Sequence, residues 1–340
     1  MMSSLRVRLL PVGQADCILL RFPDESWGVV DCGSSSHDTA TFMALDYLAR
    51  SEPQGMPLRF VVATHPDADH CLGIPGLLRH YTSNREIGAF YHCGAKRKIC
   101  RGRAAMILDV VKTAEELRDA GRIALVKAVE AGESISWEPA IPGLSIYILN
   151  PPIGAVPLRP MRSEESNDLS VTLLITFGGV SVLLSGDIEG HAWARVVSHR
   201  RFRMPRILKV PHHGSLNGAP PAVVLDAGLD GVRWALMSSN SGVVDKPHLD
   251  LLRDLWGRPD WRTRCTGLSA HCDSANKEAY PVPADSRRYP DDLRQTLMFA
   301  RRNSLFSQES TLYGCCVDNE ISVDWSGAVS HSVARKGCDG

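Results

Sequence analysis

The fold is decided by one stretch of the sequence, which reads LRFVVATHPDADH from Leu58 to His70. Its first half, residues 58–64, is an apolar run typical of a buried strand. Four potential metal ligands follow within six residues: His65, Asp67, Asp69 and His70. Ionisable side chains seldom come directly after a buried strand without a specific role. The stretch therefore predicts a metal site at the C-terminal end of a strand.

One turn of this kind can serve two cations. Alternate residues of an extended turn point the same way, so His65 and Asp67 can face one cation. Asp69 and His70 then wrap round toward a second cation, because carboxylate oxygens and imidazole nitrogens both bind divalent metals. The competing interpretation is a solvated acidic turn with incidental histidines. It does not explain why charged residues follow an apolar strand.

Two later strand ends carry related residues. The run LLSGD at 183–187 ends a strand with a glycine that permits close backbone approach, and a carboxylate at Asp187 can bridge two cations there. The run LKVPHHGS at 208–215 places His212 and His213 after another strand. Adjacent histidines point in different directions, so one can bind metal while the other handles a proton or a substrate oxygen. A lone Gly-Asp turn or a lone histidine has ordinary structural explanations, so these residues gain weight from each other.

The order of the expected elements predicts two β-rich halves. Strands are expected at 5–9, 17–22, 27–31 and 58–64, with a helix from residue 36 or 38 to residue 50. Two helical patterns between 73 and 121, the second at 103–120, flank a short strand at 87–91. A second series of strands is expected at 144–150, 170–177, 180–185, 207–210 and 234–238, with a two-residue hairpin turn at Gly178-Gly179 and helices near Pro220 and Pro247. This pattern predicts an α/β fold of the four-layer αββα type, two packed sheets flanked by helices.

The whole chain, 1–340, is expected to be a single domain. With 340 residues, 44% of them hydrophobic, it can fill a sizeable core. The stretch 274–308, rich in Pro, Arg, Asp and Ser, is expected to be an insertion or lid. Residues 314–332 are expected to form a terminal hairpin.

Charge and cysteine usage limit the partners. Lys plus Arg and Asp plus Glu both number 38, so net charge offers no general attraction to nucleic acid or membrane. We find no signal peptide and no apolar stretch near the roughly 20 residues that span a bilayer, so we expect a soluble, cytoplasmic protein with no membrane partner. The ten scattered cysteines are expected to be reduced thiols, with a structural zinc near Cys265, His271 and Cys272 as the alternative. The oligomeric state is not indicated.

Seven motifs at expected strand ends occur in a fixed order. They are VGQADC at 12–17, DCG at 31–33, the run from His65, NDLS at 167–170, GD at 186–187, HHGS at 212–215 and KPH at 246–248. This order resembles the metallo-β-lactamase superfamily, and most closely the soluble hydrolase domain of the ComEC-like DNA-uptake competence proteins. The resemblance runs from about residue 5 to residue 271. It implies a metallo-β-lactamase-like sandwich and a dinuclear site with two divalent metal ions, zinc or manganese.

The resemblance also implies roles for individual residues. The expected metal ligands, with Asp187 as the bridge, are His65, Asp67, Asp69, His70, Asp187 and His213. The expected catalytic residues are Asp69, His212 and His248, although His248 could replace His213 as the last ligand. Substrate contacts are expected from Asn167, Ser170, Lys209 and Ser215. Asn167 stands where many superfamily members have another ligand histidine, which leaves the third protein ligand of the first metal open.

Two divalent metals can supply hydroxide near neutral pH, so hydrolysis is the expected reaction, and the electrophile could be a phosphodiester, a lactone, an amide or a thioester. Asp67, in place of a second histidine, adds a hard oxygen donor and favours manganese and phosphodiesters. Two basic stretches could guide phosphates, or could be solvated faces: Lys96 to Arg103, and Arg195 to Lys209 with Arg200, Arg201, Arg203 and Arg206. The leading hypothesis is a phosphodiesterase or nuclease, whose partner would be nucleic acid or a small phosphodiester. A small-molecule hydrolase of a lactone, amide or cyclic nucleotide is second, and a non-catalytic binding module on the same fold is third.

Overall fold

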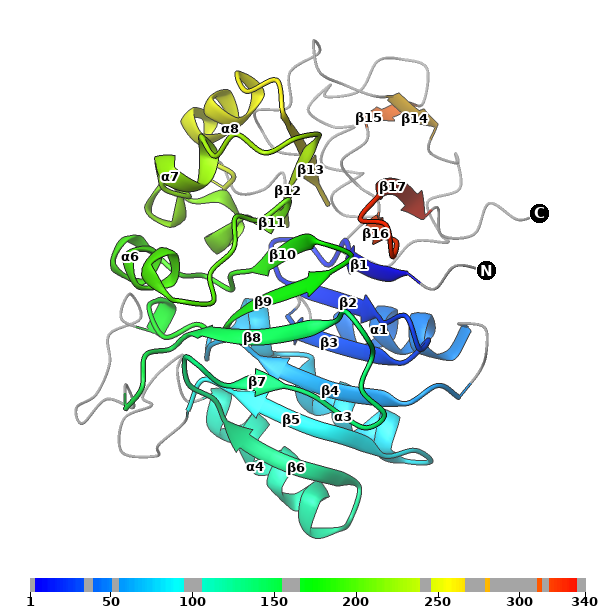
Figure 1. The fold of residues 1–340 in the computed structure, drawn as a ribbon. Coiled ribbons are helices and arrows are strands. Elements are labelled where there is room, and N and C mark those ends of the chain that lie inside the picture. Colours follow the sequence, from blue (N-terminus) through cyan, green and yellow to red (C-terminus); the bar gives the residue numbers. More distant parts are fainter. Residues whose placement is uncertain are drawn as a thin grey trace, which may run out of the picture.

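The computed structural model describes most of the chain in separate stretches. These are residues 4–33, 39–50, 55–94, 106–154, 166–238, 246–266, 279–281, 311–313 and 318–334. Within them the chain folds into two large sheets with helices on their outer faces (Figure 1). None of the helices in these stretches has the length and apolar composition needed to cross a membrane.

The first sheet has eight strands in the order β17-β16-β1-β2-β3-β4-β5-β6. Their bounds are β1 (Leu5–Leu9), β2 (Cys17–Arg21), β3 (Trp27–Cys32), β4 (Leu58–Ala63), β5 (Ile87–His92), β6 (Ile123–Ala128), β16 (Asp318–Val323) and β17 (Val329–Ala334). The four strands from β3 to β6 run parallel. Their carboxyl ends therefore share one edge, and the run that starts at His65 leaves β4 at that edge.

The second sheet has seven strands in the order β13-β12-β11-β10-β9-β8-β7. Their bounds are β7 (Ser134–Ile135), β8 (Ser145–Asn150), β9 (Thr172–Phe177), β10 (Val180–Leu184), β11 (Ile207–Lys209), β12 (Arg233–Met237) and β13 (Trp261–Cys265). β9 and β10 are antiparallel around Gly178-Gly179, both at positive φ as a two-residue hairpin requires. From β10 to β13 the strands are parallel, so Asp187 and the His212-His213 pair also follow strand ends on one edge.

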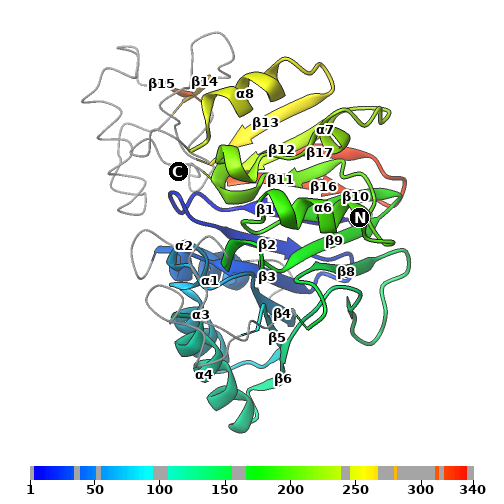
Figure 2. The ribbon, with the colours of Figure 1, turned by 90° about the vertical axis from the view of Figure 1, so that its left-hand side faces the viewer.

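Helices cover the outer face of each sheet. On the first sheet lie α1 (Thr39–Arg50), α2 (Ala68–Cys71), α3 (Ile74–Thr82) and α4 (Met106–Asp119). On the second lie α6 (Gly190–Ser198), α7 (Ala222–Leu225) and α8 (Leu249–Trp256). Figure 2 shows the two helix groups against different sheets, and a separate apolar core fills the space between the sheets. This confirms the predicted α/β sandwich, because each sheet buries both of its faces.

Alternation along β1 shows how the sequence specifies these layers. Leu5, Val7 and Leu9 are buried in the core between the sheets. Arg8 points to the other face, where its guanidinium lies 4.3 Å from the centre of the Tyr47 ring and its Nε donates to Glu320 at 3.0 Å. A period of two is what a strand with one apolar face requires.

Several boundaries differ from the sequence prediction. β9 begins at Thr172 instead of residue 170, because the amide of Val171 leaves the strand and donates to the carbonyl of Thr64 at 2.8 Å. α7 and α8 begin just after Pro221 and His248, which are their N-caps. The predicted strands omitted β6, β7 and β13, whose mixed burial weakens any apolar run.

The C-terminal part is described only in pieces. Most of the expected lid, 274–308, lies outside the described residues, apart from β14 (Ala279–Pro281), which pairs with β15 (Thr311–Tyr313). Where a hairpin was expected at 314–332, β16 and β17 pair antiparallel, and β16 extends the first sheet beside β1.

Truncation of Phe60 should weaken the packing between the sheets. The ring is fully buried and its centroid lies 5.7 Å from that of Phe22, 6.3 Å from Tyr91 and 6.2 Å from Trp137. We expect Phe60→Ala to lower the free energy of unfolding by about 3–5 kcal/mol, because it leaves a cavity that this aromatic cluster cannot close. Urea unfolding measures the loss, and Leu125→Ala at an exposed position of β6 is the control. A loss below about 1 kcal/mol would contradict the packing described here.

Candidate metal centre

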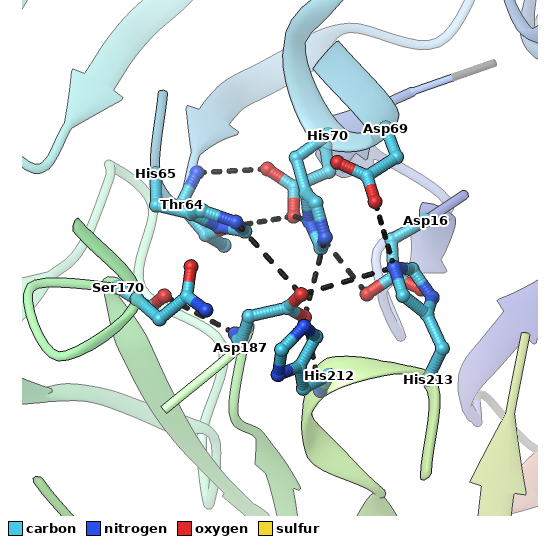
Figure 3. Close-up of polar contacts among 12 residues, drawn as sticks. Asp16, Thr64, His65, Asp69, His70, Ser170, Asp187, His212 and His213 are labelled. Atoms are coloured by element: carbon cyan, nitrogen blue, oxygen red, sulfur yellow. Dashed lines mark hydrogen bonds and ion pairs between the residues drawn. The ribbon is translucent and has the colours of Figure 1, made fainter. Parts of the chain in front are cut away.

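Three loops from the two sheets meet at one edge, after β4, after β10 and after β11 (Figure 3). Main-chain groups join them. The amide of Asp187 donates to Ser170 Oγ at 3.1 Å, and the amide of His212 donates to Asp187 Oδ1 at 3.0 Å. Together with the bond from Val171 to Thr64, these contacts fix residues of the second sheet against the end of β4.

Asp187 lies between the two histidines that the first sheet supplies. His65 Nε2 is 3.9 Å from Asp187 Oδ2, and His70 Nε2 is 3.2 Å from Asp187 Oδ1. One ligand atom from each of the three residues falls within 4.8 Å of the others, and all three residues are buried. His65 and Asp187 are therefore neighbours, as the fold prediction requires.

A second group shares His70 and opens toward solvent. It consists of Asp69, His70 and His213, and His213 Nε2 lies 3.1 Å from Asp69 Oδ2. The Asp69 side chain is 37% exposed, whereas those of His70 and His213 are fully buried. Asp69 thus forms the solvent-facing side of the cluster.

Asp31 lies beneath the cluster and orients both histidines of the first sheet. Its carboxylate accepts hydrogen bonds of 2.7 Å from the amide and from the hydroxyl of Thr64, and it lies 2.7 Å from His70 Nδ1. Because the Thr64 hydroxyl donates to Asp31, its lone pair is left to accept from His65 Nδ1, 3.1 Å away. The Nδ1 atoms of both rings are thereby held by Asp31 and Thr64, and both Nε2 atoms point toward Asp187, which is the orientation that a metal ligand needs.

Three residues of the site adopt left-handed backbone conformations that favour glycine. They are Asp31 at φ 57°, His212 at φ 51° and His213 at φ 55°. Such conformations cost about 1–3 kcal/mol each and persist where surrounding contacts enforce them. The two successive left-handed residues separate the histidines: His213 Nδ1 contacts Ser238 Oγ at 2.6 Å, and His212 Nδ1 lies 2.9 Å from Glu189 Oε1.

Asp16 and Lys209 form a buried support that the sequence analysis did not assign. Lys209 is 1% exposed, and its ammonium contacts Asp16 and lies 3.5 Å from Asp187 Oδ1. Its Nζ also donates to the carbonyl of Gly186 at 3.4 Å. Lys209, which was expected to contact substrate, instead has its charge enclosed beneath the cluster by these partners.

The turn that carries Asp69 is held tightly against the first sheet. The carbonyl of Asp69 accepts a hydrogen bond of 2.9 Å from the amide of Asp16. The carbonyl of Asp16 in turn accepts a hydrogen bond of 2.8 Å from the amide of Gly33. A Cβ at Gly33 would lie 1.6 Å from that Asp69 oxygen. Only glycine allows this approach.

The two histidines of the first sheet differ in ionisation. Burial lowers the pKa of His65 to about 3, so this ring is neutral at pH 7. Burial acts the same way on His70, but Asp187, Asp31 and Asp16 outweigh it and raise the pKa of His70 well above its ordinary value. His70 and His213 hold the pKa of Asp187 well below its ordinary value against the effect of burial.

The donor set fits divalent metals. His65 Nε2 is buried and makes no hydrogen bond to any residue within the described stretches. Its ring faces a cluster in which the carboxylates of Asp16, Asp31, Asp69 and Asp187 outnumber the one buried ammonium of Lys209. A buried lone pair beside uncompensated carboxylates is what a cation would satisfy.

Part of the chain matches a known family. Residues 10–93, which include the His65 run, match the model of the family described as the Metallo-beta-lactamase superfamily. The match supports that superfamily. A search of curated proteins found no match.

Solved structures show limited likeness. The metallo-β-lactamase fold protein YhfI from Bacillus subtilis is 14% identical with a TM-score of 0.41, and the match covers 68% of this chain and 84% of that one. Igni18, a metallo hydrolase from the archaeon Ignicoccus hospitalis, is 16% identical with a TM-score of 0.34 over 62% and 72% of the chains. A metallo β-lactamase from Hirschia baltica is 13% identical with a TM-score of 0.28 over 52% and 60%. These likenesses say nothing about the substrate of this chain.

Two predicted site residues are not brought into the groups of ligand atoms. Asp67 is the N-cap of α2, and its main-chain carbonyl accepts from the amides of His70 and Cys71 at 3.0 Å. His248 is the N-cap of α8, where its Nδ1 accepts from the amide of Asp250 at 3.2 Å. Among the described residues, the groups include His213 and neither Asp67 nor His248. The geometry therefore favours His213 over His248 as the last ligand.

The predicted substrate residues occupy different depths. Asn167 is 6% exposed and donates from Nδ2 to Glu189 Oε1 at 2.8 Å, the same oxygen that faces His212. Ser170 is fully buried and holds the amide of Asp187. Ser215 lies at the surface, where its hydroxyl contacts Asn217 at 2.5 Å. Glu189, which sequence reasoning missed, thus links two of the predicted site residues.

Removal of the carboxylate at Asp187 should release metal. We expect Asp187→Ala to lose at least one of two bound cations, because two positive charges would then face each other without the carboxylate between them. Elemental analysis after reloading with Mn²⁺ measures the content, with Asp119→Ala on the exposed end of α4 as the control. Full metal content and unchanged activity would show that Asp187 is only a turn residue.

Asp31→Asn should change the pH dependence of metal binding. A cation must displace the proton on His70, whose pKa is raised, so wild-type affinity should rise as pH increases. The variant removes one of the carboxylates that raise this pKa, so the rise should occur at lower pH. The plateau affinity should fall about 10–100-fold, because both rings lose their support. Metal titrations across pH test this, and an unchanged profile would contradict it.

Proposed function

We propose that this protein is a metal-dependent hydrolase with a dinuclear site, and that its substrates are phosphodiesters. The buried, unpartnered Nε2 of His65 beside Asp187 carries the proposal, because it marks a place built for a cation. The superfamily match gives the hydrolase class. The order of motifs supports the finer proposal of kinship with the ComEC-like competence proteins.

Three groups of ligand atoms occur among the described residues, and we assign the metal positions from the two that include neither Asp16 nor Asp31. His65, His70 and Asp187 would hold one cation, and Asp69, His70 and His213 contain the donors for the other, with Asp187 between them. The chemistry that two divalent cations, zinc or manganese, would supply there is a lowered pKa of a bound water and polarisation of the electrophile. Carboxylate oxygens from Asp69 and Asp187 make the donor set hard, which favours manganese without any part for Asp67.

The chain's own residues account for proton handling. The solvent-facing carboxylate of Asp69 has a pKa below its ordinary value despite burial, because His213 and His70 favour the charged form, so it is ionised and can orient a water. Burial lowers the pKa of His212 to about 4, so this ring is neutral at pH 7. Glu189 Oε1 lies 2.9 Å from its Nδ1, and His212 is a candidate to contact the substrate. His248 is the N-cap of α8, so a catalytic role would have to be performed from that position.

The basic stretch that precedes β11 does not form one surface. Arg195 donates to the carbonyl of Asp168 at 2.9 Å and Arg206 to that of Val232 at 3.1 Å, so both guanidinium groups have structural partners. Arg200, Arg201 and Arg203 are exposed. They follow α6 and lie close in sequence to Arg206, whose amide donates to the carbonyl of Ser181 at the start of β10. Asp187 follows the opposite end of β10. This separation favours a small phosphodiester, such as a cyclic nucleotide, over a long polymer guided by these arginines; the stretch at 96–103 lies outside the described residues.

Two alternatives have less support. A lactone or amide hydrolase would use the same centre. A non-catalytic binding module would not need an exposed ionised carboxylate beside a buried donor cluster. We also propose a cytoplasmic location, because the ten cysteines are scattered along the sequence, which is typical of reduced thiols.

Cleavage of bis(p-nitrophenyl) phosphate tests the function. We expect hydrolysis that Mn²⁺ stimulates and that Asp187→Ala abolishes. We expect charge reversal at both Arg200 and Arg201 to leave this activity within about twofold, since these residues are remote from the cluster. Loss of DNA or RNA cleavage in the same variant would reveal a phosphate track and a nuclease. Cleavage of a lactone or amide but of no phosphodiester, with either metal, would end the proposal.

A further inference from the structure

Lys246 lies beside the candidate metal centre and has no role in the assignments above. It directly precedes Pro247 and His248, and this segment packs on the turn of Pro211–Gly214 that carries the paired histidines. The amide of His248 donates to the carbonyl of Gly214 at 2.8 Å. A Cβ on Gly214 would lie 2.6 Å from Pro247 Cβ. The backbone of Lys246 is thereby fixed next to the turn of His212 and His213.

The ammonium of Lys246 is partly buried among charges of the same site. The carboxylates that act on it electrostatically belong to Asp187, Asp69 and Glu189. Its Nζ nevertheless forms no hydrogen bond or ion pair with any residue in the described part of the chain. A partly desolvated ammonium without a partner is costly, so such a group commonly has a ligand.

The comparison with Lys209 sharpens this point. Lys209 is fully buried, and Asp16, Asp187 and the Gly186 carbonyl surround its ammonium. Lys246 is only partly buried, and carboxylates of the same cluster act on its charge. One lysine thus neutralises the interior of the site, while the other retains an accessible positive charge.

We propose that Lys246 binds an anionic oxygen of the substrate, and that it selects phosphate-type substrates over neutral esters and amides. Cations at the centre would neutralise Asp69 and Asp187, so the charge of Lys246 would be left for an incoming anion. An ammonium is a compact donor that binds phosphate as a point charge. The role in turnover rests on the proposed phosphodiesterase function, whereas anion binding can be measured without it.

Binding of inorganic phosphate to the Mn²⁺-loaded protein tests the proposal. We expect Lys246→Met to weaken phosphate binding about 10–100-fold in calorimetric titrations, which is the effect of losing one charged hydrogen bond. Lys246→Arg should keep most of the affinity. Lys112→Met, which removes an exposed lysine on α4, is the matched control and should bind as the wild type does. Mn²⁺ content and thermal unfolding are measured for every variant.

Kinetics separate binding from structure. With bis(p-nitrophenyl) phosphate, Lys246→Met should raise KM about 10–100-fold and change kcat less, and hydrolysis of a neutral lactone, if any, should not change. If Lys246→Met unfolds or loses Mn²⁺, Lys246→Gln gives the same reading with a polar, uncharged end. Unchanged phosphate affinity in the folded, Mn²⁺-loaded neutral variant overturns the proposal. A wild type that binds phosphate through Lys246 but cleaves no phosphodiester would refute the proposed function and leave the anion site standing.

Discussion

The buried carboxylate of Asp31 is the constraint on which the site depends. It joins the end of β3 to the end of β4 through Thr64, and it contacts the ring of His70. Through the Thr64 hydroxyl it also sets the ring of His65. A buried carboxylate in a left-handed conformation is expensive in two ways, by desolvation and by backbone strain. This energetic cost is offset by a fixed orientation of the His65 and His70 rings.

Local sequence signals predicted the frame of the molecule well. The apolar run before His65 predicts a strand, and Gly178-Gly179 predicts a hairpin turn. Both structures depend mainly on neighbouring residues, so they can be predicted without knowledge of the rest of the chain. The convergence of His65, Asp187 and His213 could be predicted because parallel strands bring their carboxyl ends to one edge. Both successes rest on rules of strand geometry that involve few long-range contacts.

The errors and omissions have a common physical cause. Spacing placed Asp67 among the ligands, but the direction of its side chain depends on how α2 begins. His248 was expected to be catalytic or the last ligand, yet its contacts are those of a helix cap. Lys209 was expected to contact substrate, yet distant carboxylates enclose its ammonium. Asp16, Asp31 and Glu189 were overlooked because their partners are remote in sequence. Such partners become visible only when the two sheets are packed.

The division of the donor atoms between the sheets affects how the protein unfolds. His65, Asp69 and His70 follow β4 of one sheet, while Asp187 and His213 follow β10 and β11 of the other. A cation held by both sets would act as a reversible cross-link between two halves that also meet through an apolar core and a few polar contacts, such as the bond from Val171 to Thr64. Its binding free energy would then add to the cohesion of the sandwich, and removal by a chelator would loosen the halves from each other before either sheet lost its own hydrogen bonds.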